Sequence, residues 1–191
     1  MLNQRAIPNS SDPAGREAGY PVQLHGNRRG NVMATTTFIK FDGIDGESTH
    51  KDHKGEIEVL SWSWGLTNSG GATSAGGGSG VGKATPQELR VVHRYDKASP
   101  LLAKAAASGR HVRSAMLSAR KAGEGQKDFL KITMKEVFIT SVAAHDDGSG
   151  ASEELAMRYG SIDFSYAPQT TKGGLGTPVG FNWNLKTGKV S

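Results

Sequence analysis

The sequence contains no cysteine among its 191 residues. This absence excludes disulfides, thiolate metal sites and thiol catalysis, and it leaves the redox compartment open. No stretch approaches the roughly 20 apolar residues that a membrane-spanning helix needs. The first 30 residues also lack the continuous apolar region of a secretory signal peptide. We therefore expect neither membrane insertion nor export through a Sec-type signal.

Apolar residues are also scarce, at 36% of the chain, which predicts a core that is thin relative to the surface. The net charge is only +5, and basic residues are interleaved with acidic ones instead of forming clusters. This pattern is typical of a solvated surface and argues against a nucleic-acid partner. Glycine is abundant, with 26 residues, which predicts many turns and at least one flexible loop.

Residues 1–32 differ from the rest of the chain. They contain Pro8, Pro13 and Pro21, polar runs and no periodic apolar pattern, so we expect a disordered N-terminal extension. Met33 is followed at once by a strand-like segment over residues 36–41. One hypothesis is that Met33 is the native start of the protein. The folded domain is expected over residues 33–191.

Most of this domain alternates apolar and polar residues with a period of two, the pattern of β-strands. Over residues 56–66, a predicted core-facing row comprises Leu60, Trp62, Trp64 and Leu66. Ile57 and Val59 have the opposite parity, which predicts a bulge or a strand buried on both faces. A similar parity change at Gly160 predicts a second bulge. The number and spacing of the strands indicate a barrel or a sandwich.

One short helix is predicted over residues 99–108. The hydroxyl of Ser99 can cap the first turn, and Pro100 suits the first helical position, where its missing N–H costs nothing. Gly109 can adopt the left-handed conformation that ends a helix. The fold class is therefore mainly β with a single helix.

A glycine-rich segment nearly matches the phosphate-binding loop motif GxxxxGK[ST] at residues 77–84. Position 84 is Ala, so the hydroxyl that would hold magnesium is missing. A Gly/Ser run precedes the motif instead of a strand, and Pro86 follows instead of a helix that could offer its N-terminus to phosphate. We therefore interpret residues 68–83 as a flexible loop without a nucleotide cofactor.

The remaining polar residues do not form a recognisable catalytic or metal-binding set. His50 and His53 are too few ligands for a closed zinc site, which takes about four, and we expect them in a solvated turn. His93 lies on the apolar parity of its strand, which predicts a core or interface histidine. Asp146, Asp147, Glu153 and Glu154 lack the spacing of a calcium loop and are expected at a solvated hairpin tip. We therefore expect no enzyme activity, metal or cofactor.

Short motifs recur in a fixed order along residues 33–191: Phe-Ile-Lys at 38–40, Gly-Glu-Ser at 46–48, Leu-Ser-Trp-Ser-Trp-Gly at 60–65, Gly-Lys at 82–83, Ser-Pro-Leu at 99–101, Arg-Lys-Ala-Gly at 120–123, Lys-Glu-Val at 135–137 and Gly-Phe-Asn-Trp-Asn at 180–184. In this order and spacing the chain resembles the haemolysin-coregulated protein family, Hcp, the tube protein of bacterial type VI secretion. The resemblance excludes residues 1–32.

The resemblance implies a compact β-barrel of two antiparallel sheets with one helix. It also implies homohexameric rings with a wide pore, which stack into a tube inside a contractile sheath. Implied partners are the sheath, the spike and small effectors carried in the lumen. The expected location is the cytoplasm during assembly and the extracellular space after type VI export.

The resemblance places Ser61 and Ser63 on the strand that faces the lumen. If the flanking tryptophans belong to the core, both serines must point the other way. It also makes residues 68–83 the loop that reaches the next ring, with Asn68, Gly70, Gly77, Gly80 and Lys83 as its candidate contact residues. Two alternatives remain open. One is an extended Hcp with a toxin domain, for which the residues after Trp183 leave no room. The other is a stand-alone β-barrel that binds a ligand as a monomer.

Overall fold

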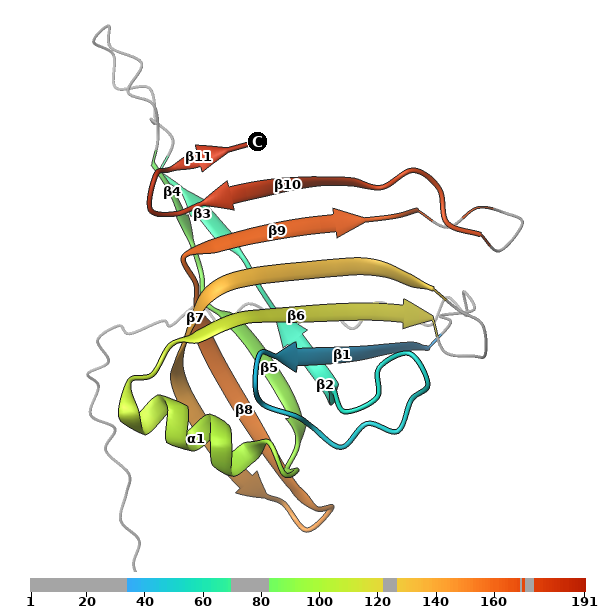
Figure 1. Cartoon of the computed structure of the whole chain (residues 1–191), viewed down its shortest axis with the longest axis vertical. Helices are drawn as coiled ribbons and strands as arrows, with labels where there is room; N and C mark the ends of the chain where they lie inside the picture. Colours follow the sequence, from blue (N-terminus) through green and yellow to red (C-terminus); the bar gives the residue numbers. More distant parts are fainter. Residues whose placement is uncertain (1–33, 70–82, 122–126, 169, 171–173) are drawn as a thin grey trace, which may run out of the picture. The chain divides into compact units, whose positions relative to one another are not determined.

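The computed structural model describes residues 34–69, 83–121, 127–168, 170 and 174–191 (Figure 1). The expected extension over residues 1–32 lies outside these ranges. The elements are β1 (Thr35–Phe41), β2 (Ile57–Ser63), β3 (Leu66–Asn68), β4 (Ala84–Pro86), β5 (Leu89–Arg94), α1 (Ser99–Ser108), β6 (Val112–Lys121), β7 (Asp128–Asp146), β8 (Ala151–Arg158), β9 (Ser161–Tyr166), β10 (Val179–Asn184) and β11 (Lys189–Val190).

The strands form a closed antiparallel barrel with an extension. A nine-stranded sheet has the order β11-β10-β9-β7-β6-β1-β2-β5-β8, and an additional pairing of β7 with β8 closes six of these strands on themselves. Strands β9, β10 and β11 continue from β7 as one wall of the molecule (Figure 1). The short strands β3 and β4 form a separate two-stranded sheet. The predicted fold class, mainly β with one short helix, is confirmed.

A sharp bend in β7 lets one long strand serve both walls. The first half of β7 pairs with β9 and the second half pairs with β8, and Figure 1 shows the strand turning between them. At the bend, Glu136 has a positive φ of 54° and Gly160 lies opposite, donating its N–H to the Lys135 carbonyl at 2.9 Å. A Cβ at Gly160 would lie 3.2 Å from the Glu136 Cβ, so glycine permits this close approach. The irregularity predicted at Gly160 is thus a break between two strands instead of a bulge within one.

The bulge predicted in β2 is present, and it corrects the predicted core-facing row. Val59 pairs with His93 but Ser61 pairs with Val92, so Leu60 is the extra residue. Before the bulge, Ile57 and Val59 point inward. After it, Trp62 and Trp64 point inward and pack, partly buried, against the core. Leu60 itself is 56% exposed, and Leu66, beyond the end of β2, is 46% exposed. Both leucines had been expected in the core.

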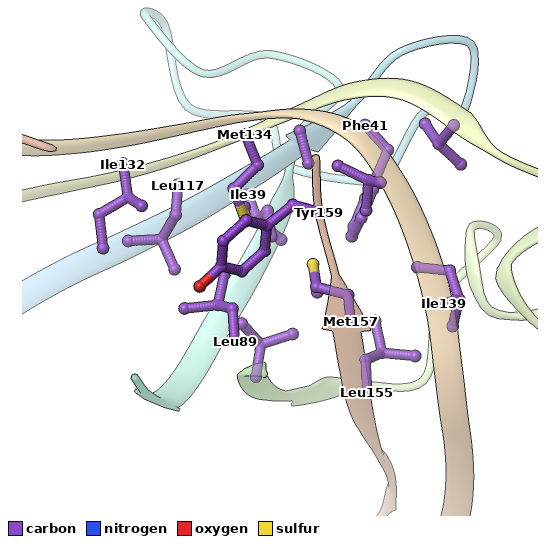
Figure 2. Packing of buried hydrophobic residues seen from close by; sticks show 14 of the residues in the cluster. Ile39, Phe41, Leu89, Leu117, Ile132, Met134, Ile139, Leu155, Met157 and Tyr159 are labelled. Atoms are coloured by element: carbon purple, nitrogen blue, oxygen red, sulfur yellow. The ribbon is translucent and has the colours of Figure 1, made fainter. Parts of the chain in front are cut away.

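The interior of the barrel is filled by inward-facing residues from every barrel strand. The fully buried large apolar side chains include Ile39, Phe41, Leu89, Leu117, Ile132, Met134, Ile139 and Leu155, most of which Figure 2 shows converging from opposite walls. His93 is completely buried among these strands, as predicted, and its Nε2 lies 3.1 Å from the Glu153 Oε1 on its cross-strand partner. A carboxyl and an imidazole therefore satisfy each other inside the barrel.

Helix α1 has the predicted length, but its N-terminus is capped differently. The cap residue is Ala98, and the Ser99 hydroxyl accepts a hydrogen bond from the Asp96 N–H at 3.1 Å, upstream of the helix. Gly109 has a φ of 64° and ends the helix as expected. The N–H groups of Gly109 and Arg110 bond to the carbonyls of the last turn, which is the Schellman arrangement.

Candidate functional site

Ser61 and Ser63 lie on the outer surface of the barrel wall formed by β2, β5 and β8. Both side chains are exposed. Ser63 is paired with Arg90 of β5, and between the serines Trp62 turns toward the core opposite Val91. The β2 bulge is the local cause, because it reverses the parity that begins with Ile57. The outward direction of both serines, which the alternation predicts, is confirmed, whereas their place in a lumen remains a prediction.

The surface around Ser63 is polar, with charges that balance one another. Arg90 forms ion pairs with Glu154 at 3.1 Å and Glu88 at 3.4 Å. Arg158 of β8 contacts the same Glu88 at 3.1 Å. The two arginine side chains are 52% and 75% exposed, so each pair contributes only about 0–1 kcal/mol to stability. This wall can hydrogen-bond a protein surface passing over it without selecting strongly for one charge.

An open hollow of about 630 Å³ adjoins this wall, with Ser63 on its margin and Tyr159 among its lining residues. Trp64 donates its indole N–H to the Tyr159 hydroxyl, which in turn donates to the Gln87 carbonyl at 3.0 Å. Burial raises the pKa of Tyr159, so the phenol stays protonated and keeps this donor role. The hydrogen-bond chain fixes the junction between β2 and β3 to the end of β8.

The described residues include only the two ends of the predicted ring-stacking loop. Gly70, Gly77 and Gly80 lie outside the described residues, as does nearly all of the near-match to the phosphate-binding loop. Asn68, which we expected within the loop, instead belongs to β3 and pairs with Ala84 of β4. Lys83 is exposed, and its backbone N–H donates to the Ser69 hydroxyl at 3.2 Å. The two ends of the loop are therefore held together by the β3–β4 ladder.

The expectation of a solvated turn at His50 and His53 is wrong for His53, which is 3% exposed. Its ring stacks on Phe38 of β1 with centroids 4.3 Å apart. Its Nδ1 lies 2.8 Å from the Glu56 Oε2, and its Nε2 lies 3.0 Å from the Asp128 Oδ1. Asp128 is distant in sequence, so no local pattern could have indicated this contact.

Arg120 completes this buried charge network, which comprises His53, Glu56, Arg120 and Asp128, with the exposed Asp52 at its margin. Arg120 donates from Nε to the Asp128 Oδ1 at 2.9 Å and from Nη1 to the Asp52 Oδ2 at 2.8 Å. Burial acts to raise the pKa of Asp128, but the hydrogen bonds from Arg120 and His53 outweigh it, and the pKa is lowered. The network ties the segment between β1 and β2 to the ends of β6 and β7, so its role is structural.

Asp146 and Asp147 lie at an exposed hairpin tip between β7 and β8, as predicted. The same prediction is wrong for Glu153, which lies within β8 and is 1% exposed because its side chain faces His93 inside the barrel. Within the described ranges, no group of three or more histidine, aspartate or glutamate residues is arranged to hold a metal ion. In the same part of the chain, no helix has both the length and the apolar character required to cross a bilayer.

Comparison with known proteins agrees with this geometry. Residues 38–166 match the family model described as "Type VI secretion system effector, Hcp". The chain is 41% identical over 160 residues to protein hcp1 of Pseudomonas aeruginosa, covering 81% of this chain and 97% of that protein. A solved type six secretion system protein superposes with a TM-score of 0.78 at 31% identity, covering 83% of this chain and 100% of that one. Hcp1 from Salmonella typhimurium superposes with a TM-score of 0.66 at 33% identity and the same two coverages. The chain therefore belongs to the Hcp family of type VI secretion tube proteins.

Proposed function

We propose that this chain assembles into homohexameric rings that stack into the tube of a type VI secretion system and carry small effectors in their lumen. The observation that carries the proposal is the combination of family membership with an open sheet edge. Strand β10 pairs along its whole length with β9, but on its other side β11 pairs only with Trp183 and Asn184. Among the described residues, the edge from Val179 to Phe181 therefore offers backbone groups for pairing with another chain.

The composition of this edge also favours lateral assembly. Val179 and Val190 are 63% and 60% exposed, so apolar side chains as well as backbone groups are available to a neighbouring chain at this edge. A ring of identical subunits meets head to tail, so the edge of one copy would cover a different surface of the next and leave no edge free. Export by the type VI apparatus then requires no separate signal on the chain.

The test of assembly is the mass of the native particle, measured by light scattering during size-exclusion chromatography. The expected mass is that of six protomers at micromolar concentration. A monomer at every concentration would contradict the ring and favour a stand-alone binding barrel, with the hollow beside Ser63 as its ligand site.

The lumen assignment is tested by Ser63→Gln. Because Ser63 is exposed and points away from the core, the longer side chain should fit without disturbing the fold, yet it would obstruct a passing effector. We expect intact hexamers that no longer retain a co-expressed small effector of the same secretion system. Thr49→Gln is the matched control, because Thr49 is also exposed but lies between β1 and β2, and this variant should retain the effector. Loss of the hexamer in Ser63→Gln would show instead that Ser63 is a structural or interface residue.

A further inference from the structure

A second groove, of about 1040 Å³, lies beside the bend of β7. Its floor includes Val112 of β6, Phe138 of β7 and Tyr159 after β8. The ring of His111 packs against Phe138 with centroids 5.3 Å apart and forms part of one side. The groove thus offers an apolar floor that is open to solvent.

The rim of this groove carries an excess of positive charge. Its lining residues include four exposed cations, Arg110, Arg113, Arg158 and Lys186, and two carboxylates, Asp42 and Glu136. We call it the basic groove. The contacts between Arg113 and Asp42 at 3.6 Å and between Lys186 and Glu136 at 2.7 Å are exposed, so they are weak enough to rearrange around an incoming anion. Arg158 is also paired, with Glu88 at 3.1 Å, so Arg110 is the one rim cation to which the described residues supply no carboxylate.

Strands β7 and β8 form a hairpin whose turn lies at the end away from the groove. This turn carries an acidic tip, which comprises Asp146 and Asp147. Within the turn, Asp147 accepts hydrogen bonds from the Ser149 hydroxyl at 2.6 Å and the Ser149 N–H at 3.0 Å. These bonds lower the pKa of Asp147 and keep its carboxylate charged. A Cβ built at Gly150 would lie 3.7 Å from the Arg94 Nη1 of β5, so one cation also lies near the turn.

The tip and the groove are separated by the length of β8. The strand begins at Ala151 beside the tip and ends at Arg158 on the groove rim, and its eight residues span about 26 Å at the usual rise per residue. In Figure 1 the tip projects from the barrel at the end of β8 away from the bend. Two complementary surfaces therefore stand at opposite ends of one rigid element.

We propose that the acidic tip of one copy enters the basic groove of the next copy and forms a contact between stacked rings. A contact between two different surfaces of identical chains either closes into a ring or continues as an open stack in one direction. A tube of stacked rings requires the second kind of contact. The charged residues on both sides of the contact are exposed. The contact therefore suits weak stacking between rings better than the larger apolar interface expected within a ring. The inference rests on the proposed ring and names the residues through which rings meet.

Cysteine crosslinking tests the contact without background, because the chain has no cysteine of its own. Arg113→Cys places a thiol on the groove rim and Ser149→Cys places one in the tip. A mixture of the two variants, concentrated under stacking conditions and treated with a short bis-maleimide, should give a covalent dimer on a denaturing gel. Each variant alone, and a mixture of Ser149→Cys with Thr49→Cys, should not. Dilution to isolated hexamers should abolish the dimer.

Charge reversal tests the chemistry of the contact. The groove is reversed by combining Arg110→Glu and Arg113→Glu in the Arg158→Cys background. The tip is reversed by combining Asp146→Arg and Asp147→Arg in the Ser149→Cys background. Each reversed variant, mixed with an unreversed partner, should give a crosslink yield that is lower by about tenfold or more. The reason is that like-charge juxtaposition in an interface costs several kcal/mol. Mixing the two reversed variants should restore the yield, and 1 M salt should weaken the original contact, because the screening length falls to about 3 Å.

The outcomes separate this inference from the proposed function. A wild-type chain that stays monomeric overturns the ring itself. Hexamers that stack without a groove-to-tip crosslink overturn this contact alone, and so do reversed variants that fail to rescue each other. A crosslink that persists in isolated hexamers also overturns the proposal, since the contact would then lie within a ring.

Discussion

Removal of the Asp128 carboxylate should destabilise the fold more than any other single charge deletion in the buried charge network. Its Oδ1 accepts hydrogen bonds from the Arg120 Nε at 2.9 Å and the His53 Nε2 at 3.0 Å, and it lies 2.8 Å from the Arg120 Nη2. In Asp128→Ala, Arg120 would keep only the exposed Asp52 as a carboxylate partner, although its own side chain is 7% exposed. His53, at 3% exposed, would keep only Glu56.

The expected loss follows from these burials. Deleting one partner of a buried ion pair costs about 3–5 kcal/mol, because the remaining charge is left without compensation. Asp128 is 12% exposed, and water can partly replace it, so we expect the lower end, about 3 kcal/mol. For a chain of this size each kcal/mol lowers Tm by about 2–4 °C, which predicts a decrease of about 6–12 °C.

The assay is thermal denaturation followed by circular dichroism, at one fixed protein concentration because assembly makes Tm depend on concentration. Asp52→Ala is the matched control. It removes the other carboxylate that contacts Arg120, but Asp52 is 55% exposed, so the loss should be below about 1 kcal/mol. Equal effects of the two variants, or a change in Asp128→Ala below about 0.5 kcal/mol, would refute the reasoning, since surface substitutions typically fall within that range.

Three further predictions follow from the same structure. Because the folded-state pKa of Asp128 is lowered, its contribution is present above the unfolded value near pH 4 and is lost as the pH falls through the folded value. Asp128→Ala should therefore flatten the acid limb of the stability curve measured by urea titration. Gly180→Ala should destabilise β10 and disrupt the edge proposed for lateral pairing, because the new Cβ would overlap the Phe164 carbonyl. Hexamers of normal mass and stability in this variant would contradict the prediction. Leu102→Ala, at a fully buried helix position, should cost about 2–5 kcal/mol in chemical denaturation, and a cost near zero would mean that α1 is not packed as described.

Local features of this protein were predictable because they depend on neighbours in the chain. The end of α1 at Gly109 follows from a backbone conformation that glycine adopts readily. The bulge in β2 follows from a change of parity between Val59 and Trp62, which a regular strand cannot accommodate when one face is buried. The outward direction of Ser63 follows in turn from the inward direction of Trp62.

The alternation of apolar and polar residues, however, indicates only that the two faces of a strand differ. It does not indicate which part of the protein covers either face. Leu60 has the parity of a core residue but lies exposed at the bulge. His53 has the sequence context of a solvated turn but is buried, because a carboxylate from β7 reaches it. Ser99 looked like a helix cap, but its hydroxyl accepts from an upstream N–H, since the preceding turn brings Asp96 back to it.

The sequence alone established a cysteine-free, mainly β domain with one helix and the motif order of the Hcp family. These properties are set by composition, by period and by residues that limit their own backbone angles. The tertiary structure alone decided that β7 bends at Glu136 to close the barrel, that Asp128 joins His53 and Arg120, and that β8 separates a basic groove from an acidic tip. The physical reason is that these features depend on contacts between residues far apart in the chain, which arise only when the sheet closes.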